Sequence, residues 1–226
     1  MSQEQQTSFA GFWLYKRRES WYGIEDIDWN DAKNETVSVL TDPGEGVTVR
    51  GTYSLVGLNA NADFMVWTVA LELEALQDYA VRFARTPLGR HLDMKYNYFG
   101  LGGLSLYDPT HSPAFVEGKD AKRYLSVYPF IKTHDWYLLP FEERRRLMKE
   151  HGELGRDYPT ISTNTVNSFG LQDQEFVVAL EDDDPETMLK MVQALRSAEV
   201  RKYTTLDTPI FLGHRKPAAQ ALADLR

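Results

Sequence analysis

The sequence predicts an α+β protein in which a single chain contains two ferredoxin-like halves. The main observation is an internal repeat: a turn, a strand and an amphipathic helix follow one another at residues 57–92 and again at residues 170–203. Each copy is flanked by further strand-like segments, so that strand–helix–strand units with antiparallel hairpins occur twice. We therefore expect one α+β unit over residues 1–226, with an N-terminal half at 11–107 and a C-terminal half at 120–213.

In the N-terminal half, the pattern predicts three strands and one helix. The segment at 48–57 and the run that begins near Phe64 are rich in β-branched and aromatic residues, which favour strands. The segment YNYFGLGGLSLY at 96–107 predicts a further strand, and its glycines indicate a bulge or a close approach of the backbone to a neighbour. The helix presents an apolar face made of Leu76, Tyr79, Ala80 and Phe83.

In the C-terminal half, strands are expected at 123–130, 162–170 and 176–180. A helix over 185–200 follows, because an aspartate directly before a proline suits the N-cap and the first helical position. The buried face of this helix is expected to carry Met188, Met191, Val192 and Leu195.

Another helix is predicted over 140–151, and it places His151 at its end. Pro140 suits the first helical position, glutamates fill the first turn, and Gly152 can supply a left-handed stop. At helical spacing His151 shares an apolar face with Leu147 and Met148. Two interpretations are open from these residues: a histidine that interacts with the last carbonyls and the helix dipole, or an imidazole that ligates a haem iron.

Composition excludes several classes of function. The net charge of −8 argues against binding to a phosphate backbone, which requires a basic face, so no nucleic-acid partner is expected. The apolar runs are too short to span a bilayer, and the polar start MSQEQQTS does not resemble a signal peptide, so we expect a soluble cytoplasmic protein without a membrane partner. The absence of cysteine excludes thiolate catalysis and iron–sulfur clusters, and redox chemistry would therefore need another cofactor.

A long segment, YLSVYPFIKTHDWYLLPFEERRRLMKEHGELGRDYP at 124–159, closely resembles the chlorite dismutase-like haem proteins, specifically the coproheme decarboxylases. The resemblance continues through 163–182 and, more weakly, through 50–67. It implies a dimeric α+β barrel made of two ferredoxin-like halves, usually assembled as a homopentamer. The whole chain, 1–226, would then form a single unit of this family.

The resemblance also assigns roles to individual residues. His151 takes the position of the proximal haem iron ligand, and Glu199, on the last turns of the helix 185–200, is the expected carboxylate partner of its second ring nitrogen. Tyr128 matches the redox-active tyrosine of these decarboxylases. Lys132, four residues later, matches a lysine that contacts a porphyrin propionate.

Three further positions follow from the resemblance. His111 resembles the distal histidine of the actinobacterial-type enzymes and would deprotonate hydrogen peroxide at the iron. Asn164 stands where true chlorite dismutases carry an arginine that holds the anionic oxidant, so chlorite conversion should be weak or absent. Asn164 and Thr208 are expected among the residues that contact the cofactor.

The implied reaction is the hydrogen peroxide-dependent oxidative decarboxylation of iron-coproporphyrin III (coproheme) to haem b, the last step of coproporphyrin-dependent haem biosynthesis. The porphyrin is then both substrate and cofactor. A transient contact with coproporphyrin ferrochelatase is a further expectation. The alternatives are a haem-binding carrier or sensor, or a general haem peroxidase, with the same fold.

Overall fold

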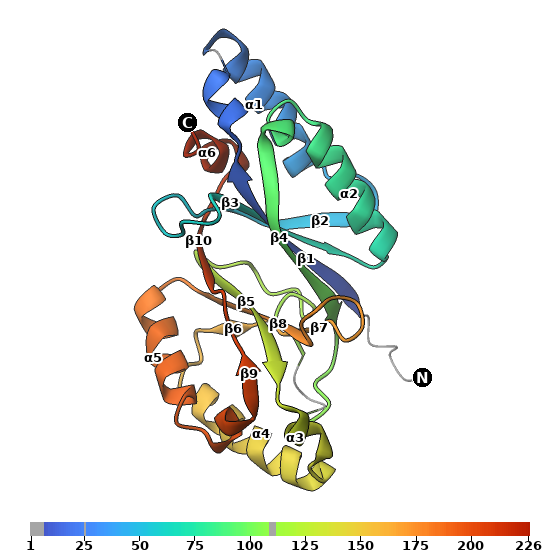
Figure 1. Cartoon of the computed structure of the whole chain (residues 1–226), viewed down its shortest axis with the longest axis vertical. Coiled ribbons are helices and arrows are strands. Elements are labelled where there is room, and N and C mark those ends of the chain that lie inside the picture. The colour runs from blue at the N-terminus through green and yellow to red at the C-terminus, as the bar shows by residue number, and fades with distance from the viewer. Residues whose placement is uncertain (1–6, 25, 109–111) are drawn as a thin grey trace. The chain divides into compact units, whose positions relative to one another are not determined.

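The computed structural model describes residues 7–24, 26–108 and 112–226 and shows an α+β chain that divides into two compact units. One unit combines Thr7–Leu101 with the C-terminal segment Phe211–Arg226, and the other contains Gly102–Ile210. Figure 1 shows the order of their helices and strands along the chain.

The first unit is built on an antiparallel sheet in which β1 pairs with β3 and β3 pairs with β2. Phe12 of β1 lies opposite Trp67 of β3, and β2 carries an irregularity between Val49 and Gly51. The strands follow one another in the order β4 (Leu92–Gly102), β1 (Ser8–Arg17), β3 (Phe64–Ala70), β2 (Val47–Ser54) and β10 (Phe211–Lys216). The helical segments are η1 (Glu19–Gly23), α1 (Asp26–Thr41), α2 (Leu73–Arg85), η2 (Gly89–His91) and α6 (Ala218–Ala223).

The core of this unit lies between one face of the sheet and its helices. Alternate residues of β3, Phe64 and Val66, point into it and pack against α2. Leu76, Tyr79 and Phe83 of α2 are buried, and Ala80 packs against the same cluster, which confirms the predicted apolar face of this helix.

The second unit is organised around β5 (Tyr124–Lys132) and β8 (Phe176–Asp182), which pair in antiparallel fashion from Tyr124 opposite Asp182 to Phe130 opposite Phe176. The predicted strand at 123–130 is confirmed, whereas the segment predicted as a strand at 162–170 contains only two short pieces. These are β6 (Ser162–Thr163) and β7 (Val166–Asn167), both paired with β8, while β9 (Thr204–Leu206) pairs with β5. The helical segments are α3 (His134–Leu138), α4 (Phe141–Arg156), α5 (Pro185–Leu195) and η3 (Glu199–Tyr203).

Helix α5 begins as predicted and ends earlier. The Asp184 side chain accepts hydrogen bonds from the backbone N–H groups of Glu186 and Thr187, and Pro185 occupies the first turn. The helix ends at Leu195 rather than at residue 200, because the chain then turns into η3. Glu199 therefore lies in a separate 3₁₀ segment and not on the last turns of α5.

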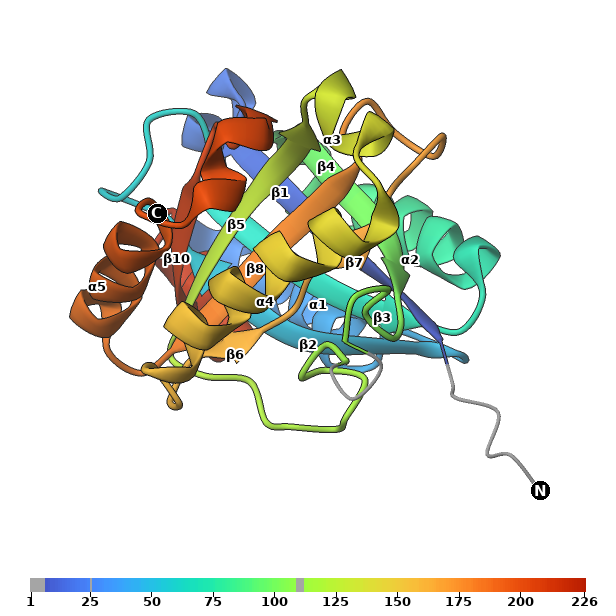
Figure 2. The same cartoon turned by 90° about the horizontal axis from the view of Figure 1, so that it is seen from below.

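Helix α4 extends past its predicted end, so the expected stop at Gly152 is wrong. Gly152 is not among the glycines with a positive φ angle, and the helix continues to Arg156. Leu147 and Leu154, on either side of this glycine, pack in the same apolar cluster, and this packing outweighs the penalty of about 1 kcal/mol for a helical glycine. His151 is consequently an interior residue of α4. Figure 2 shows α4 crossing in front of β8 and β5.

Candidate functional site

Strand β5 presents Tyr128 and Lys132 on the same face, because side chains four residues apart on a strand point the same way. Tyr128 lies opposite Val178 of β8, and Lys132 lies opposite Thr204 of β9. Both side chains are half-buried. The strand thus holds a phenol and an ammonium on one rigid element.

The ammonium of Lys132 lies over aromatic rings rather than in water. Its Nζ is 4.5 Å from the centroid of the Trp136 ring and 5.1 Å from that of Phe130. Burial lowers the pKa of Lys132 to about 8; the carboxylate of Glu175 opposes this shift and the guanidinium of Arg201 adds to it. The side chain is therefore cationic at neutral pH and incompletely solvated, a state that favours a carboxylate partner.

His151 projects from α4 into a desolvated position. Burial lowers the pKa of His151 to about 4, and the positive charge of Lys132 adds to this shift, so that the two side chains lie within electrostatic reach of each other. Among the residues that the structure describes, nothing forms a hydrogen bond with the buried Nδ1 atom of His151. A neutral imidazole with an unsatisfied buried nitrogen is a good ligand for a metal ion.

The kind of metal follows from what surrounds His151. No group of three or more histidine, cysteine, aspartate or glutamate side chains that could hold a metal ion occurs within the described ranges. A metal bound through one imidazole must bring its remaining ligands with it. The residues present thus fit an iron porphyrin: the porphyrin ring would supply most of the ligands to the iron, and His151 would supply one from the protein.

Tyr128 keeps its proton over the whole neutral range. Burial raises the pKa of Tyr128 to about 12; Arg196 and Arg201 lower it and Asp207 raises it further. Asp207 is paired with both arginines, and its Oδ2 lies 2.8 Å from Nη1 of Arg201. Arg201, a member of this charged cluster beside Tyr128, also acts electrostatically on Lys132 and lowers its pKa.

Glu199, the expected partner of His151, is engaged elsewhere. Its carboxylate accepts hydrogen bonds from Arg146, at 2.9 Å, and from Lys202, at 3.3 Å, and its side chain is 42% exposed. The role of Glu199 toward His151 stays a prediction. For Glu199 to bind the imidazole of His151, its carboxylate would have to release Arg146.

Asn164, expected near the cofactor, is fully buried and holds a loop in place. Its Oδ1 accepts a hydrogen bond from the backbone N–H of Phe115 at 2.9 Å, and its Nδ2 donates to Glu181 at 3.1 Å. The same loop packs on β4, where a Cβ added to Gly102 would lie 2.5 Å from the Phe115 ring; the predicted close approach is confirmed. Asn164 thus acts on this loop, and its contact with a cofactor stays a prediction.

Replacement of Asn164 by alanine should lower the free energy of unfolding by about 1–3 kcal/mol, because the N–H of Phe115 and the carboxylate of Glu181 lose a buried partner. Chemical denaturation measures this loss. The exposed Asn34, replaced in the same way, serves as control and should change stability by less than about 0.5 kcal/mol. Equal effects of the two substitutions would contradict the structural role of Asn164.

Two further residues, His111 and Thr208, were predicted to belong to this site. His111 lies outside the described residues. Thr208 is exposed in the loop between β9 and β10, directly after Asp207 and before a cis peptide bond to Pro209. Their proposed contacts with peroxide and porphyrin stay predictions.

The structure adds three residues that the sequence pattern did not reveal. Trp136 and Glu175 contact Lys132, and Arg201 lies near both Lys132 and Tyr128. Trp136 lies four residues after Lys132, across a change from strand to helix, so neither strand nor helix periodicity relates them. Glu175 and Arg201 are distant in sequence and carry no motif of their own.

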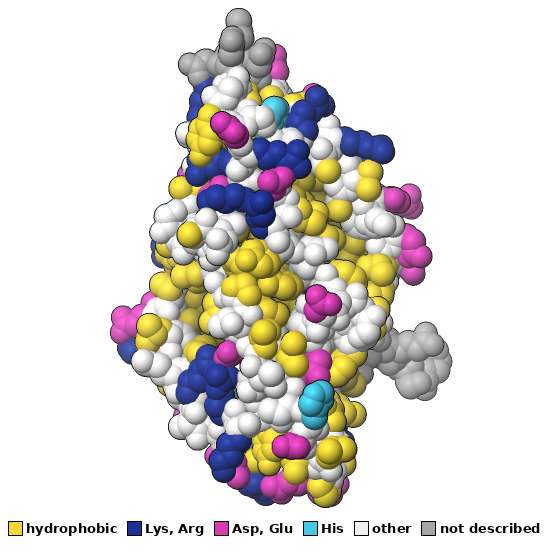
Figure 3. Space-filling model, viewed as in Figure 1, with side chains coloured by type: hydrophobic (Ala, Val, Ile, Leu, Met, Phe, Trp, Pro, Cys, Tyr) yellow, Lys and Arg dark blue, Asp and Glu magenta, His cyan; other side chains and the backbone are white. Residues whose placement is uncertain are grey.

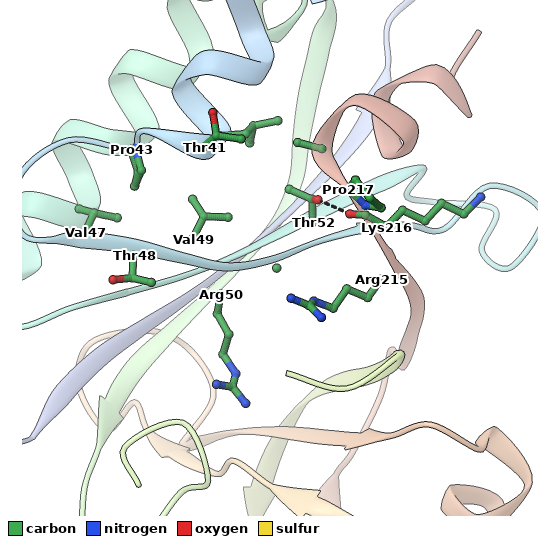
Figure 4. Close-up of a pocket in the computed structure, with 13 residues that line it drawn as sticks. Thr41, Pro43, Val47, Thr48, Val49, Arg50, Thr52, Arg215, Lys216 and Pro217 are labelled. Atoms are coloured by element: carbon green, nitrogen blue, oxygen red, sulfur yellow. Dashed lines mark hydrogen bonds between the residues drawn. The ribbon is translucent and has the colours of Figure 1, made fainter. Parts of the chain in front are cut away.

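A separate pocket lies in the first unit and contains none of the predicted site residues. Its volume is about 620 Å³, and its walls are the end of α1, the edge of β2 and the start of α6. Figure 4 shows Arg50 and Arg215 on one side of β2 and Val49 on the other. This pocket has no neutral imidazole or phenol in its lining and is not part of the site of Tyr128, Lys132 and His151.

Comparison with known proteins identifies the family to which this chain belongs. The chlorite dismutase family model matches residues 29–216, and the chain belongs to the chlorite dismutase family. Within the family it is 40% identical, over 200 residues, to the coproheme decarboxylase of Mycolicibacterium smegmatis; the match covers 88% of this chain and 87% of that protein. A coproheme decarboxylase of Thermus thermophilus is 27% identical over 214 residues, which are 88% of this chain and 81% of that protein.

Solved structures support the fold. A mutant chlorite dismutase from Candidatus Nitrospira defluvii superposes with a TM-score of 0.87 at 24% identity, covering 96% of this chain and 95% of that one. Another mutant of the same enzyme gives a TM-score of 0.88 at 23% identity, covering 98% and 96% of the two chains. At this identity the likeness establishes the fold alone. None of the helices in the described part of the chain is both long and apolar enough to cross a membrane.

Proposed function

We propose that this chain catalyses the hydrogen peroxide-dependent oxidative decarboxylation of iron-coproporphyrin III to haem b. The observation that carries the proposal is the neutral, half-buried imidazole of His151, with its buried Nδ1 atom, within electrostatic reach of the Lys132 ammonium. One group can ligate the iron and the other can hold a propionate carboxylate. The 40% identity to a coproheme decarboxylase supports the same reaction.

The stoichiometry of the reaction defines what the protein must provide. In each of two steps a propionate side chain becomes a vinyl group, and one hydrogen peroxide is consumed while one carbon dioxide and two waters are released. The bound iron supplies the activation of peroxide. The protein must therefore fix the ring, hold its carboxylates and relay an electron and a proton between the reacting propionate and the iron.

His151 and Lys132 provide the binding functions in this proposal. The imidazole stays unprotonated above about pH 4, so that no proton competes with the iron for its lone pair. The ammonium of Lys132, held over Trp136 and Phe130, pairs with a propionate in an environment that strengthens the interaction.

In this proposal Tyr128 transfers an electron and a proton between the reacting propionate and the iron. Because its phenol is protonated at neutral pH, it loses an electron only together with the proton on its Oη atom. The resulting tyrosyl radical takes a hydrogen atom from the propionate chain, which restores the phenol and leaves a carbon radical. This radical gives its second electron to the peroxide-derived oxidant as the bond to the carboxylate breaks, so that carbon dioxide leaves and the vinyl group forms, and the proton of the carboxyl group ends in water. His111 is proposed as the base for peroxide, Glu199 as the second partner of His151, and Asn164 and Thr208 as residues near the porphyrin.

We also propose the quaternary arrangement that the family resemblance implies: a dimeric α+β barrel within each chain, homopentamers in solution and a transient contact with coproporphyrin ferrochelatase. The exposed apolar residues Tyr137, Leu138 and Phe141 of the α3–α4 region support an association surface. Figure 3 shows hydrophobic side chains in the region of α3 and α4. Light scattering of the purified protein measures the number of subunits.

The pKa of Lys132 predicts how porphyrin binding depends on pH. Because this pKa is lowered to about 8, the ammonium is present at neutral pH and is lost as the pH rises through about 8. The affinity of the free protein for iron-coproporphyrin III should therefore fall above about pH 8. Optical titrations across this range measure it. Lys132→Met should bind more weakly and lose this dependence, whereas Lys202→Met, at a largely exposed lysine, should keep it; an unchanged profile in Lys132→Met would contradict the assignment.

The proposed function is tested by optical titration followed by peroxide. Iron-coproporphyrin III added to the purified protein should give saturable spectral changes at one porphyrin per chain, and hydrogen peroxide should then convert the spectrum to that of haem b. Binding without conversion would indicate a carrier or sensor. Oxidation of a reporter dye with no change in the porphyrin would indicate a general peroxidase, and either result would contradict the decarboxylase.

A further inference from the structure

A carboxylate that the reaction does not use joins the two elements that surround Lys132. Oε2 of Glu175 accepts a hydrogen bond from the backbone N–H of Lys132 at 2.7 Å. The same oxygen accepts a second hydrogen bond from the Tyr137 hydroxyl at 2.6 Å. Glu175 directly precedes β8, Lys132 is the last residue of β5, and Tyr137 lies on α3. One oxygen thus fixes the end of a strand to the helix that follows it.

A chain of aromatic contacts leads from Tyr137 back to Lys132. Together with Glu175 it forms a closed set of contacts, which we call the circuit. Tyr137 contacts Phe169 with ring centroids 6.0 Å apart, and Phe169 contacts Phe176 at 4.9 Å. Phe176 in turn contacts Phe130 at 6.4 Å, and the Lys132 ammonium lies over the Phe130 ring. The backbone around Glu175 is also held, since its carbonyl accepts from the N–H of Ser168 at 2.8 Å. Each member of the circuit has a second partner within it.

The circuit determines where the ammonium can lie. Lysine has a long flexible side chain, and a ligand that immobilises it must offset the loss of its rotational entropy. The bond from Glu175 fixes the backbone at Lys132, and the position of α3 sets the Trp136 ring under its Nζ atom. The side chain is thereby organised before a ligand arrives.

We propose that Glu175 is a positioning residue for porphyrin binding: it fixes Lys132 and α3 relative to each other so that the ammonium is placed for a propionate carboxylate. The inference rests on the proposed function for the identity of the ligand. Glu175 itself makes no contact with the porphyrin in this account. Its effect reaches the ligand through Lys132.

The test compares Glu175→Ala, Glu175→Gln and a control, Asp173→Ala, which removes the same charge from an exposed position on the same hairpin. The measurements are made at about pH 6, below the pKa of about 8 of Lys132 in the parent, and they address two properties of each variant. One is the rate of hydrogen exchange at the Lys132 amide in the ligand-free protein. The other is the Kd for iron-coproporphyrin III, together with the decarboxylation rate at saturating porphyrin.

Glu175→Ala should accelerate exchange at the Lys132 amide about tenfold or more and raise the Kd about tenfold, with a saturating rate within about twofold of the parent. Glu175→Gln should stay near the parent, because an amide oxygen accepts the same two hydrogen bonds. Asp173→Ala should change neither quantity. If Glu175→Ala does not fold, Tyr137→Phe, which removes one donor, should raise the Kd by a smaller factor.

Unchanged exchange and Kd in Glu175→Ala would overturn the inference, and so would a loss in Glu175→Gln equal to that in Glu175→Ala, which would assign the effect to charge. A parent protein that binds the porphyrin and never decarboxylates it would contradict the proposed function alone. In that case, amide exchange and Kd would still decide the role of Glu175.

Discussion

Replacement of Tyr128 by phenylalanine is expected to leave the Kd for iron-coproporphyrin III within about twofold of the parent and to slow decarboxylation by about a hundredfold or more. The substitution removes only the hydroxyl from a half-buried ring on β5. Packing against β8 is retained, so the binding site keeps its shape. Phenylalanine has no O–H group, and its ring is much harder to oxidise than a phenol. The transfer of an electron and a proton through this position is therefore lost.

The matched control for this prediction is Tyr124→Phe. Tyr124 is also half-buried on β5 and, four residues before Tyr128, points from the same face of the strand. Its substitution should leave the decarboxylation rate within about twofold of the parent. Product formation at the parent rate in Tyr128→Phe would remove Tyr128 from the reaction.

Replacement of His151 by alanine is expected to raise the Kd for iron-coproporphyrin III by about a hundredfold and to leave the Kd for metal-free coproporphyrin within about threefold. The reason is that an axial ligand contributes to iron binding and not to binding of the metal-free ring. The variant should fold, since the Nδ1 atom of His151 has no hydrogen-bond partner within the described residues and its removal breaks no buried pair.

Added imidazole should restore the axial ligand in His151→Ala and return the spectrum of the bound iron porphyrin toward that of the parent. His134→Ala is the control, because this histidine is exposed at the start of α3. An iron-porphyrin spectrum that is unchanged in His151→Ala, before any imidazole is added, would show that another residue ligates the iron.

The fold was predictable where local chemistry decides the structure. The N-cap at Asp184 with Pro185 after it, and the apolar face of Leu76, Tyr79 and Phe83, depend on neighbours in the sequence, and both were confirmed. Gly152 was wrong as a helix stop, because the end of α4 is decided by packing of Leu147 and Leu154 against other elements. Tertiary contacts of this kind leave no local signal.

The site was predictable only in part. The helix pattern singled out His151 but left its role open, and only the family resemblance assigned roles to His151, Tyr128 and Lys132. Strand periodicity adds that Tyr128 and Lys132, four residues apart, share a face of β5. The electrostatic coupling of Lys132 and His151 appears only when β5 and α4 are placed together. Arg201 and Glu175 act through space on residues far from them in sequence, so neither pattern nor spacing could find them.

Mass spectrometry of the porphyrin, after the protein has been mixed with iron-coproporphyrin III and titrated with hydrogen peroxide, decides whether this chain is a coproheme decarboxylase. We expect two successive losses from the porphyrin, each of one carbon dioxide and two hydrogens, that end at haem b and consume one hydrogen peroxide each. A porphyrin of unchanged mass, or bleaching without these products, would contradict this expectation.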